Sequence, residues 1–343
     1  MADSMRSRFE AALARSAIRI PKTLLDRAFA SPIEHDGHRL DPQMALILFL
    51  ARLARKPHTH ELPLESARAD LEANALVFAP TTFALAEVTD ENIEGHRVRA
   101  YRPHGLPERA PALVYFHGGG WVTGSLDSHD APCRVLANEA RCIVLSVDYD
   151  LAPEHPFPDA PDDAVAAFRA IADHAPSLGV DTSRIAVGGD SAGGNLAAVV
   201  SADVRADAIR PMFQLLFYPS TDATMSMPSI KTLGHGFFLE RETMDWFIDR
   251  YVPDRTMRSL PRVSPLWASD FKGLPQTLVV TAGFDPLRDE GEAYARKLKE
   301  AGVAVDYRCY GSLFHGFINT AGAVDAARDA LCESAHALRR AFQ

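Results

Sequence analysis

Residues 184–196 read RIAVGGDSAGGNL, and this stretch decides the fold. A β-branched run leads to Ser191, which has one glycine two positions before it and another two positions after it, and a helix-forming segment follows. This G-x-S-x-G order is typical of a nucleophile elbow, a sharp strand-to-helix turn that lifts the serine hydroxyl off the backbone. Only small residues fit beside such a turn, which accounts for Gly189 and Gly193. The pattern predicts that Ser191 is the nucleophile of a hydrolase or acyl transferase; the alternative is a glycine-rich loop with a solvated serine.

Around this stretch, runs that are apolar on both faces alternate with helical segments. A hairpin is also expected, from alternating residues 83–89 and 96–101 connected by residues 90–95. Continuous apolar strands separated by helices predict an α/β fold with a mostly parallel central sheet flanked by helices. The expected strands are 112–116, 142–147, 185–187, 212–217, 276–281 and 305–310, and the expected helices are 131–139, 162–174, 192–204, 290–301 and 325–342.

Two regions depart from this alternation and predict a helical cap. Residues 1–78 form a helical N-terminal segment without a clear strand, with helices over 6–18, from Asp41 through 53, and over 65–75. The remaining residues, 79–343, are expected to form the α/β domain. Within it, residues 222–265 are too long and too aromatic for a plain loop and predict a second cap segment. Four of its aromatic residues are candidates to line a pocket, although aromatic side chains at helical spacing more often form core: Phe237, Phe238, Trp246 and Phe247.

The composition is that of an ordinary globular protein. The chain has 343 residues with 36 basic and 45 acidic side chains, a net charge of −9. This balance argues against nucleic acid as a partner, because such binding needs concentrated Lys and Arg. The four cysteines form no C-x-x-C pair and are interpreted as small buried residues. No signal peptide is evident, and the early apolar run 44–50 is too short to cross a bilayer. We expect a cytoplasmic location without stable membrane insertion.

Ligands of an open α/β sheet bind beyond the carboxyl ends of its strands, so we expect the polar groups of a site there. Residues 117–121 read HGGGW and follow the strand 112–116. Three consecutive glycines leave backbone N–H groups free to point at a ligand, as in the oxyanion hole of lipases and esterases. Acyl transfer requires such donors, because one of them is worth roughly 2.7–4 kcal/mol to the developing oxyanion. The alternative is a flexible loop. Trp121 either walls the site or only packs.

A base is expected to be a histidine that comes after Ser191 and after an acid, the order usual in this fold. Of the three histidines beyond Ser191, His336 lies within the last helix, and His235 lies in the cap segment before the best acid. His315 follows the strand 305–310 and is the preferred base.

The acid must also follow a strand. Asp285 comes directly after the strand 276–281 and its short extension, and the following proline keeps its backbone out of a helix. Asp222 is the second choice. Asp289 and Glu290 are expected to cap the next helix at its positive end.

Together these motifs resemble a known family. HGGGW at 117–121, GDSAG at 189–193, DPLRDE at 285–290 and HGF at 315–317 are similar to the bacterial hormone-sensitive-lipase-like esterases, also called family IV, in the G-D-S-A-G subgroup. Residues 148–158, DYDLAPEHPFP, are similar to the family sequence YRLAPEHPFP, with Asp150 in place of the usual arginine. The resemblance covers about residues 80–343. It implies the α/β-hydrolase fold, a helical cap, and esters of short to medium acyl chains as substrates.

The resemblance also implies roles for the site residues. Ser191, Asp285 and His315 would form a catalytic triad that works through an acyl-enzyme. The N–H groups of Gly119, Gly120 and Ala192 would form the oxyanion hole, with Ala192 at the positive end of a helix.

Other activities share this machinery and stay open as alternatives. An amidase, a lactonase or a thioesterase uses the same triad. Plant gibberellin receptors resemble the family and bind a small molecule without hydrolysis, but they have lost the catalytic histidine, which is present here as His315. We expect a small-molecule ester as partner and neither a cofactor nor a metal; His58 and His60 have no third ligand nearby and predict a surface loop. A homodimer is compatible with the sequence.

Overall fold

An eight-stranded sheet forms the centre of the computed structural model, which describes residues 20, 22–29, 31–78 and 84–343. The strand order is β10-β9-β8-β7-β5-β6-β4-β3. The strands from β5 to β10 run parallel, whereas β4 is antiparallel to both β3 and β6. The predicted mostly parallel sheet is therefore confirmed. The bounds are β3 Glu87–Ile93, β4 His96–Arg102, β5 Ala110–Phe116, β6 Ile143–Val147, β7 Val180–Asp190, β8 Phe213–Phe217, β9 Gln276–Phe284 and β10 Val305–Phe314.

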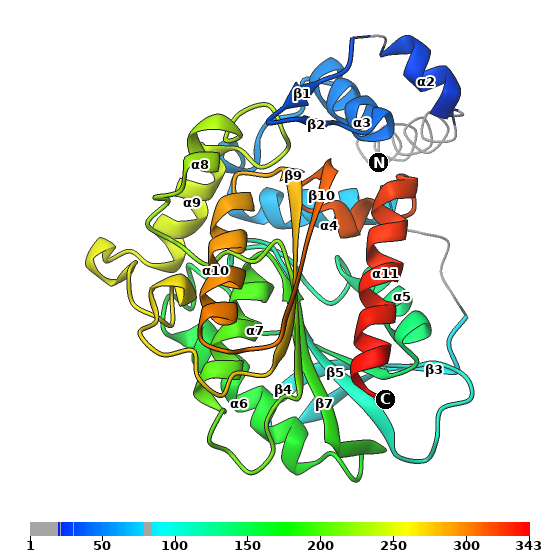
Figure 1. The fold of residues 1–343 in the computed structure, drawn as a ribbon, viewed down its shortest axis with the longest axis vertical. Helices are drawn as coiled ribbons and strands as arrows, with labels where there is room; N and C mark the ends of the chain where they lie inside the picture. Colours follow the sequence, from blue (N-terminus) through cyan, green and yellow to red (C-terminus); the bar gives the residue numbers. More distant parts are fainter. Residues whose placement is uncertain (1–19, 21, 30, 79–83) are drawn as a thin grey trace.

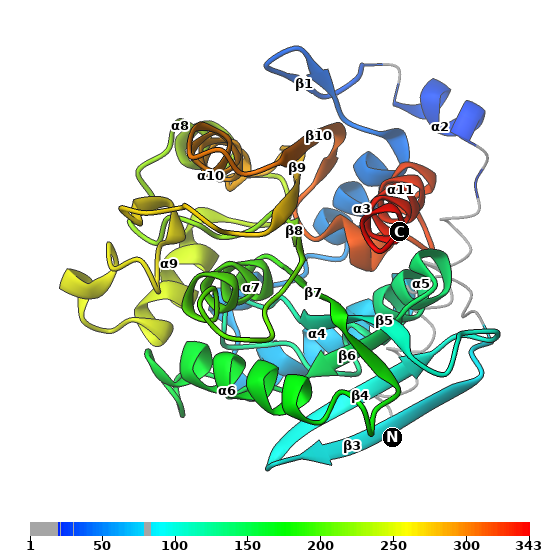
Figure 2. The same cartoon turned by 60° about the horizontal axis from the view of Figure 1, so that its bottom comes forward.

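Helices cover both faces of this sheet (Figure 2). Helices α6, α7 and α10 lie on one face, and α5 and α11 lie on the other. The strands between them are apolar on both sides because both sides are buried; every residue of β5, β6 and β8 is buried. The bounds are α5 Asp130–Ala140, α6 Asp159–Asp173, α7 Ala192–Asp203, α10 Arg288–Glu300 and α11 Asp325–Ala341.

The hairpin of β3 and β4 differs from the expected one. Its turn contains only Glu94 and Gly95, both with positive φ (52° and 97°), and residues 90–93 belong to the strand instead of a loop. Such two-residue turns suit the twist of antiparallel strands. Asp90 stays in the strand because Arg99 and Arg97, on the paired strand, donate to its carboxylate. The hydrogen bond from Arg99, supported by that from Arg97, lowers the pKa of Asp90 to about 2.

The N-terminal segment contains two short strands that were not expected. β1 (Glu34–His35) and β2 (His38–Arg39) form a small hairpin around Asp36 and Gly37, and an Asp-Gly pair is a turn signal that the sequence does contain. The helices are α2 Lys22–Ala28, α3 Pro42–Leu53 and α4 Leu64–Phe78, with a 3-10 turn η1 at Thr59–Glu61. Asp41 caps α3 as expected by accepting from Gln43 N–H. The helix expected over 6–18 lies outside the described residues.

Residues 222–265 include two helices that lie, with α3 and α4, toward the upper end of the sheet in Figure 1. They contain α8 (Pro228–Thr232), α9 (Arg241–Tyr251) and η2 (Arg255–Met257), and η3 (Pro265–Trp267) follows. A hydrogen bond of 2.9 Å between His60 Nδ1 and Thr243 Oγ1 joins the N-terminal segment to α9. The two cap segments, distant in sequence, are thus in contact.

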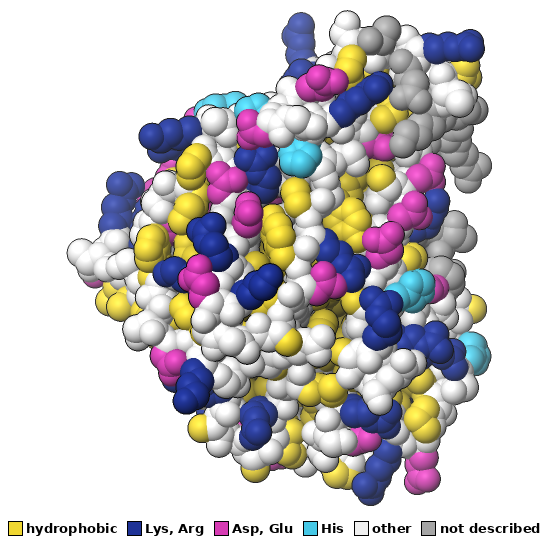
Figure 3. Space-filling view, in the orientation of Figure 1, with side chains coloured by type: hydrophobic (Ala, Val, Ile, Leu, Met, Phe, Trp, Pro, Cys, Tyr) yellow, Lys and Arg dark blue, Asp and Glu magenta, His cyan; other side chains and the backbone are white. Residues whose placement is uncertain are grey.

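Basic and acidic side chains are interspersed over the face shown in Figure 3. None of the helices in the described ranges is both long and apolar enough to pass through a membrane.

Candidate active site

Ser191 lies at the turn between β7 and α7. Its φ of 53° is in the left-handed region, which costs a residue other than glycine about 1–3 kcal/mol and persists only where the surroundings enforce it. Ser191 N–H donates to the carbonyl of Phe217 (2.9 Å), and the Ser191 carbonyl accepts from Asn195 N–H (3.0 Å) and Ser220 N–H (3.1 Å). These bonds hold the serine in the strained turn.

The glycines on either side are required by close backbone approach. A Cβ on Gly193 would lie 2.0 Å from the carbonyl oxygen of Phe116, and a Cβ on Gly189 would lie 2.4 Å from the carbonyl carbon of Gly193. Both obstacles are backbone atoms, which cannot swing aside as a flexible side chain does. Any larger residue would therefore open the turn that presents Ser191.

One chain of hydrogen bonds joins Ser191, His315 and Asp285. Ser191 Oγ–H donates to His315 Nε2 (2.9 Å), and His315 Nδ1–H donates to Asp285 Oδ2 (2.8 Å). Asp285 is fully buried, and its other oxygen accepts Leu287 N–H at 2.8 Å. The three residues follow β7, β10 and β9 directly, so the parallel sheet brings them to one edge. The geometry fits a nucleophile, a base and a group that orients the base.

The other candidates lie elsewhere. The carboxylate of Asp222 accepts from the backbone and hydroxyls of Thr224 and Ser226 and from Trp267 Nε1, and so closes a turn. His336 is an exposed residue of α11 whose Nε2 lies 3.1 Å from a carboxylate oxygen of Glu139. His235 is exposed on the cap.

Asp289 and Glu290 lie in the first turn of α10, at its positive end, as expected, but their carboxyl groups accept backbone N–H groups of other segments. Asp289 accepts from Ser229 N–H on α8, and Glu290 accepts from the N–H groups of Thr221 and Asp222 (2.6 and 3.0 Å). The N–H groups of Thr221 and Asp222, which follow β8, are buried and need an acceptor, and Glu290 supplies it. Glu290 is fully buried, and burial raises its pKa well above the ordinary range.

Residues 117–121 form a loop beside Ser191, here called the oxyanion loop. Gly119 and Gly120 have positive φ (124° and 61°), which glycine adopts without strain. Within the part of the chain that the structure describes, the N–H groups of Gly119, Gly120 and Ala192 donate to no protein acceptor. Gly118 N–H, in contrast, donates to Asp190 Oδ1 (2.9 Å), so it is not free to receive an oxyanion and instead holds the loop in place. Each of the three residues expected to hold an oxyanion therefore has a backbone donor that could receive one.

His117, in the same loop, does not offer a second base. It is completely buried, and its Nδ1 lies 2.9 Å from the carbonyl oxygen of Gly118. Burial, reinforced by the neighbouring His129, lowers the pKa of His117 to about 3. The ring is therefore neutral at pH 7, and it packs on Tyr149 with the ring centres 4.4 Å apart.

A cavity of about 470 Å³ lies in front of Ser191 and reaches up into the cap. Gly119, Gly120, Ser191 and His315 line its floor. Its apolar wall comes from three helices, α3, α4 and α9: Ile47, Leu48, Leu71, Phe78, Met244 and Ile248.

Two of the four candidate cap aromatics line this cavity. Phe247 packs its ring directly over the Cα of Gly120, where a Cβ would lie 2.2 Å from the ring, and Phe238 lines the cavity from the loop before α9. Phe237 packs on Phe284 instead, and Trp246 lies under the guanidinium of Arg250.

Trp121 serves both expected purposes. It lines the cavity and stacks on Tyr251 with the ring centres 4.3 Å apart.

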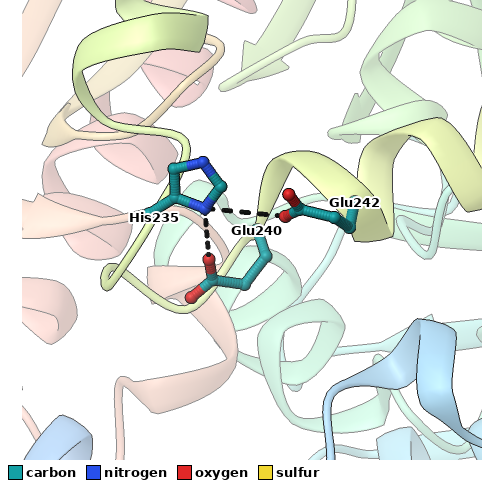
Figure 4. A group of neighbouring side chains, drawn as sticks. All are labelled: His235, Glu240 and Glu242. Atoms are coloured by element: carbon teal, nitrogen blue, oxygen red, sulfur yellow. Dashed lines mark ion pairs between the residues drawn. The ribbon is translucent and has the colours of Figure 1, made fainter.

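His235, Glu240 and Glu242 form a second group of polar side chains (Figure 4), of which His235 and Glu242 are exposed, whereas Glu240 is buried and lines the cavity. His235 Nδ1 lies 3.3 Å from Glu240 and 3.5 Å from Glu242. The ion pairs account for this closeness, and Glu240 also accepts Gly236 N–H. His58 and His60 stack with ring centres 5.6 Å apart. His58 is exposed in the loop before η1, as expected, and also lines the cavity rim, whereas His60 is half-buried in η1 and bonds to Thr243.

Several features of the site were not foreseen from the sequence. The N-terminal helices were assigned to the cap, but which of their residues face Ser191 depends on packing that no local pattern reports. Asp190 was noted only as a subgroup marker, yet it bonds to the oxyanion loop. Asp150, the departure from the family sequence, is exposed and lies 3.8 Å from His155. An exposed ion pair of this kind carries little energy.

Comparison with known proteins agrees with this arrangement. A family model described as the alpha/beta hydrolase fold matches residues 113–319. The carboxylic ester hydrolase LipN of Mycobacterium tuberculosis is 44% identical over 297 residues, which cover 83% of this chain and 78% of that protein. Ethyl acetate hydrolase of Pseudomonas putida is 37% identical, covering 88% of this chain and 99% of its own.

Solved structures give the same result. An alpha/beta hydrolase enzyme from the metagenome of Lake Arreo, Spain, is 43% identical and superposes with a TM-score of 0.86, over 88% of this chain and 98% of that one. A hyperthermophilic esterase from Pyrobaculum calidifontis, 38% identical, has a TM-score of 0.82 over 88% of this chain and 98% of its own. By sequence and by fold, this chain belongs to the hormone-sensitive-lipase-like (family IV) esterases of the alpha/beta hydrolase superfamily and is a carboxylic ester hydrolase.

Proposed function

We propose that this enzyme cleaves its ester through an acyl-enzyme on Ser191. His315 Nε2 accepts the serine proton as Oγ attacks the ester carbonyl, and the tetrahedral intermediate collapses when His315 returns the proton to the leaving alcohol. Water then attacks the acyl-enzyme by the same route. Asp285 holds the imidazole with Nδ1 protonated and stabilises the imidazolium. The observation that carries this proposal is the unbroken hydrogen-bonded chain from Asp285 to Ser191.

In the same proposal, the N–H groups of Gly119, Gly120 and Ala192 receive the oxyanion. All three lack a protein acceptor in the described ranges. Ala192 is also the first residue of α7, so the partial positive charge of the helix end favours the anion. No metal takes part in these steps, because the serine, the histidine and the backbone donors supply each proton and each charge.

The proposed substrates are esters of short to medium acyl chains. The cavity is apolar along its wall and has about 470 Å³ of space, which is at the lower end of the range for small-molecule sites. Phe247 and Phe238 limit its depth from the cap side. The relative from Pseudomonas putida is named for ethyl acetate, an ester with a two-carbon acyl group.

The experiment is a series of p-nitrophenyl esters from acetate to palmitate, with Ser191→Ala as the test of the nucleophile. We expect kcat/KM to be highest between acetate and octanoate and turnover by Ser191→Ala to fall at least about 10³-fold. Near-normal turnover by that variant would refute the acyl-enzyme, and a best rate on palmitate would refute the chain-length assignment. A p-nitroanilide and a lactone in the same series test the amidase and lactonase alternatives.

We also propose a cytoplasmic location. The four cysteines are free, and Cys133 and Cys142 are buried, an arrangement that suits a reducing compartment. Fractionation of the source cells tests this directly.

A further inference from the structure

A second buried acid–histidine pair lies next to Ser191 in the sequence and the fold. Asp190, the residue before the serine, is 3% exposed, and His129, the residue before α5, is 1% exposed. His129 Nε2 lies 3.2 Å from one oxygen of Asp190 and 3.4 Å from the other. The mechanism proposed above does not use either side chain.

The carboxylate of Asp190 is surrounded by donors. Its Oδ1 accepts Gly118 N–H of the oxyanion loop at 2.9 Å and the hydroxyl of Tyr115 at 2.7 Å. Its Oδ2 is 3.5 Å from the hydroxyl of Tyr218, whose ring lies against His315 with the ring centres 4.6 Å apart. Both oxygens of the Asp190 side chain must therefore be acceptors, because a donor in either position would face other buried donors and be left unpaired.

Asp190 lies close against the oxyanion loop at Gly118, the first of its three glycines. A Cβ on Gly118 would lie 2.3 Å from Asp190 Oδ2, so the carboxylate fills the space beside the loop where a side chain would otherwise be. Gly118 precedes the two glycines with free N–H groups. The position of those donors relative to Ser191 therefore depends on where Asp190 holds Gly118.

His129 is itself fixed on both sides of its ring. Ser128 Oγ–H donates to the carbonyl of Ser125 (2.9 Å), which leaves the Ser128 oxygen to accept from His129 Nδ1 at 2.8 Å. The other nitrogen then faces Asp190. Although burial alone would raise it, the charge and the hydrogen bond of His129, with those of Tyr115 and Gly118, hold the pKa of Asp190 below its usual range.

We propose that Asp190 and His129 form a positioning pair that holds the oxyanion loop in register with Ser191. Asp190 bonds directly to Gly118 N–H, and His129 orients the Asp190 carboxylate. Neither residue touches the reacting atoms. The inference rests on the proposed function, since it assigns the loop donors to the oxyanion.

A positioning role makes a specific kinetic prediction for Asp190→Asn. The amide keeps one acceptor but turns an NH₂ group toward the donors that face the carboxylate, so the loop must shift. Because loss of one oxyanion donor lowers kcat about 10²–10³-fold, we expect a shifted loop to lower kcat at least about tenfold while KM for p-nitrophenyl butyrate changes less than about twofold. His129→Gln should show the same pattern with a smaller loss.

Three further measurements separate positioning from a general effect on the fold. Rates are expressed per active site, counted by stoichiometric labelling with a fluorophosphonate, so that misfolded protein does not contribute. A trifluoromethyl ketone, which forms a tetrahedral oxyanion on the serine, should lose affinity by the same factor as kcat/KM. The double variant Asp190→Asn/His129→Gln should be no more than about twofold worse than Asp190→Asn, because both residues act through Gly118.

Glu290→Gln is the matched control. Glu290 also carries a fully buried carboxyl group that accepts two backbone N–H groups, but these belong to Thr221 and Asp222, away from the oxyanion loop. We expect its kcat to stay within about twofold of wild type. A kcat per labelled site within twofold of wild type for Asp190→Asn, or a loss confined to KM, would overturn the inference. If Asp190→Asn does not fold, His129→Gln decides on the same criteria. Activity that survives Ser191→Ala would instead refute the proposed function.

Discussion

Phe247→Ala should move the acyl-chain preference toward longer esters. The ring of Phe247 lies over the Cα of Gly120, at the junction of the cavity and the oxyanion loop. Truncation removes a phenyl ring from the cavity wall and leaves space next to the reacting carbonyl. Acyl carbons of longer esters, for which the wild-type cavity has no room, would be buried in that space.

The magnitude follows from the burial of methylene groups. Each buried methylene contributes about 0.8 kcal/mol, which is about fourfold in kcat/KM. If the space left by the ring admits about two more methylenes, the ratio of kcat/KM for octanoate to that for butyrate rises about 15-fold. Because the ring is partly exposed, the loss of stability should be below the ~3–5 kcal/mol of a fully buried phenylalanine.

The assay compares p-nitrophenyl butyrate and octanoate for wild type, Phe247→Ala and Trp246→Ala. Trp246 is the matched control, since it is the adjacent aromatic of α9 and stacks on Arg250 outside the cavity. Damage to the oxyanion loop lowers both rates and cancels in the ratio. An unchanged ratio for Phe247→Ala, or an equal change for Trp246→Ala, would show that Phe247 does not limit the acyl site.

Three further outcomes follow from the structure. Gly193→Ala places a Cβ 2.0 Å from a carbonyl oxygen, whereas Gly302→Ala meets nothing within 4 Å, although Gly302 has a positive φ of 86° and Gly193 does not. Thermal unfolding should show Gly193→Ala to be the less stable by about 1–3 kcal/mol, and equal melting temperatures would contradict this. Burial raises the pKa of Glu290, so above about pH 4.3 Glu290 ionises in the unfolded chain only, and wild type loses stability as the pH rises. The melting temperature of Glu290→Gln relative to that of wild type should therefore increase from pH 5 to pH 8. A difference in melting temperature that stays constant would contradict the raised pKa. Treatment with EDTA and the substitution His235→Ala should both leave turnover of p-nitrophenyl butyrate unchanged. A loss of turnover that added zinc restores would contradict a metal-free mechanism.

The chemistry of the site was accessible from the sequence because each group follows a strand. Ser191, Asp285 and His315 come directly after β7, β9 and β10, and the carboxyl ends of parallel strands meet at one edge. A run of apolar residues followed by a polar one is a local pattern. The order of the three residues along the chain then selected among thirteen histidines.

The cavity was not accessible in this way, because its wall is made by contacts between distant segments. Leu48 and Phe247 meet around the same space, but nothing in either local sequence records the other. The same holds for Phe237 and Phe238, adjacent in the chain, of which only Phe238 lines the cavity. The hairpin was misplaced for a related reason: Asp90 looks like a loop residue until Arg99 is found opposite it.

The cap and the oxyanion loop are joined by direct contacts, so acyl specificity and turnover are not independent properties of this enzyme. Phe247 packs on Gly120, and Arg68 of α4 donates to the carbonyls of Val122 (2.9 Å) and Ala152 (3.2 Å) just beyond the loop. A substitution that reshapes the pocket therefore also changes the support of the donors that receive the oxyanion. Donor placement acts on the transition state of every ester alike, whereas pocket shape distinguishes one acyl chain from another. Ratios between substrates report the pocket and absolute kcat reports the loop, and only measuring both can separate the two contributions.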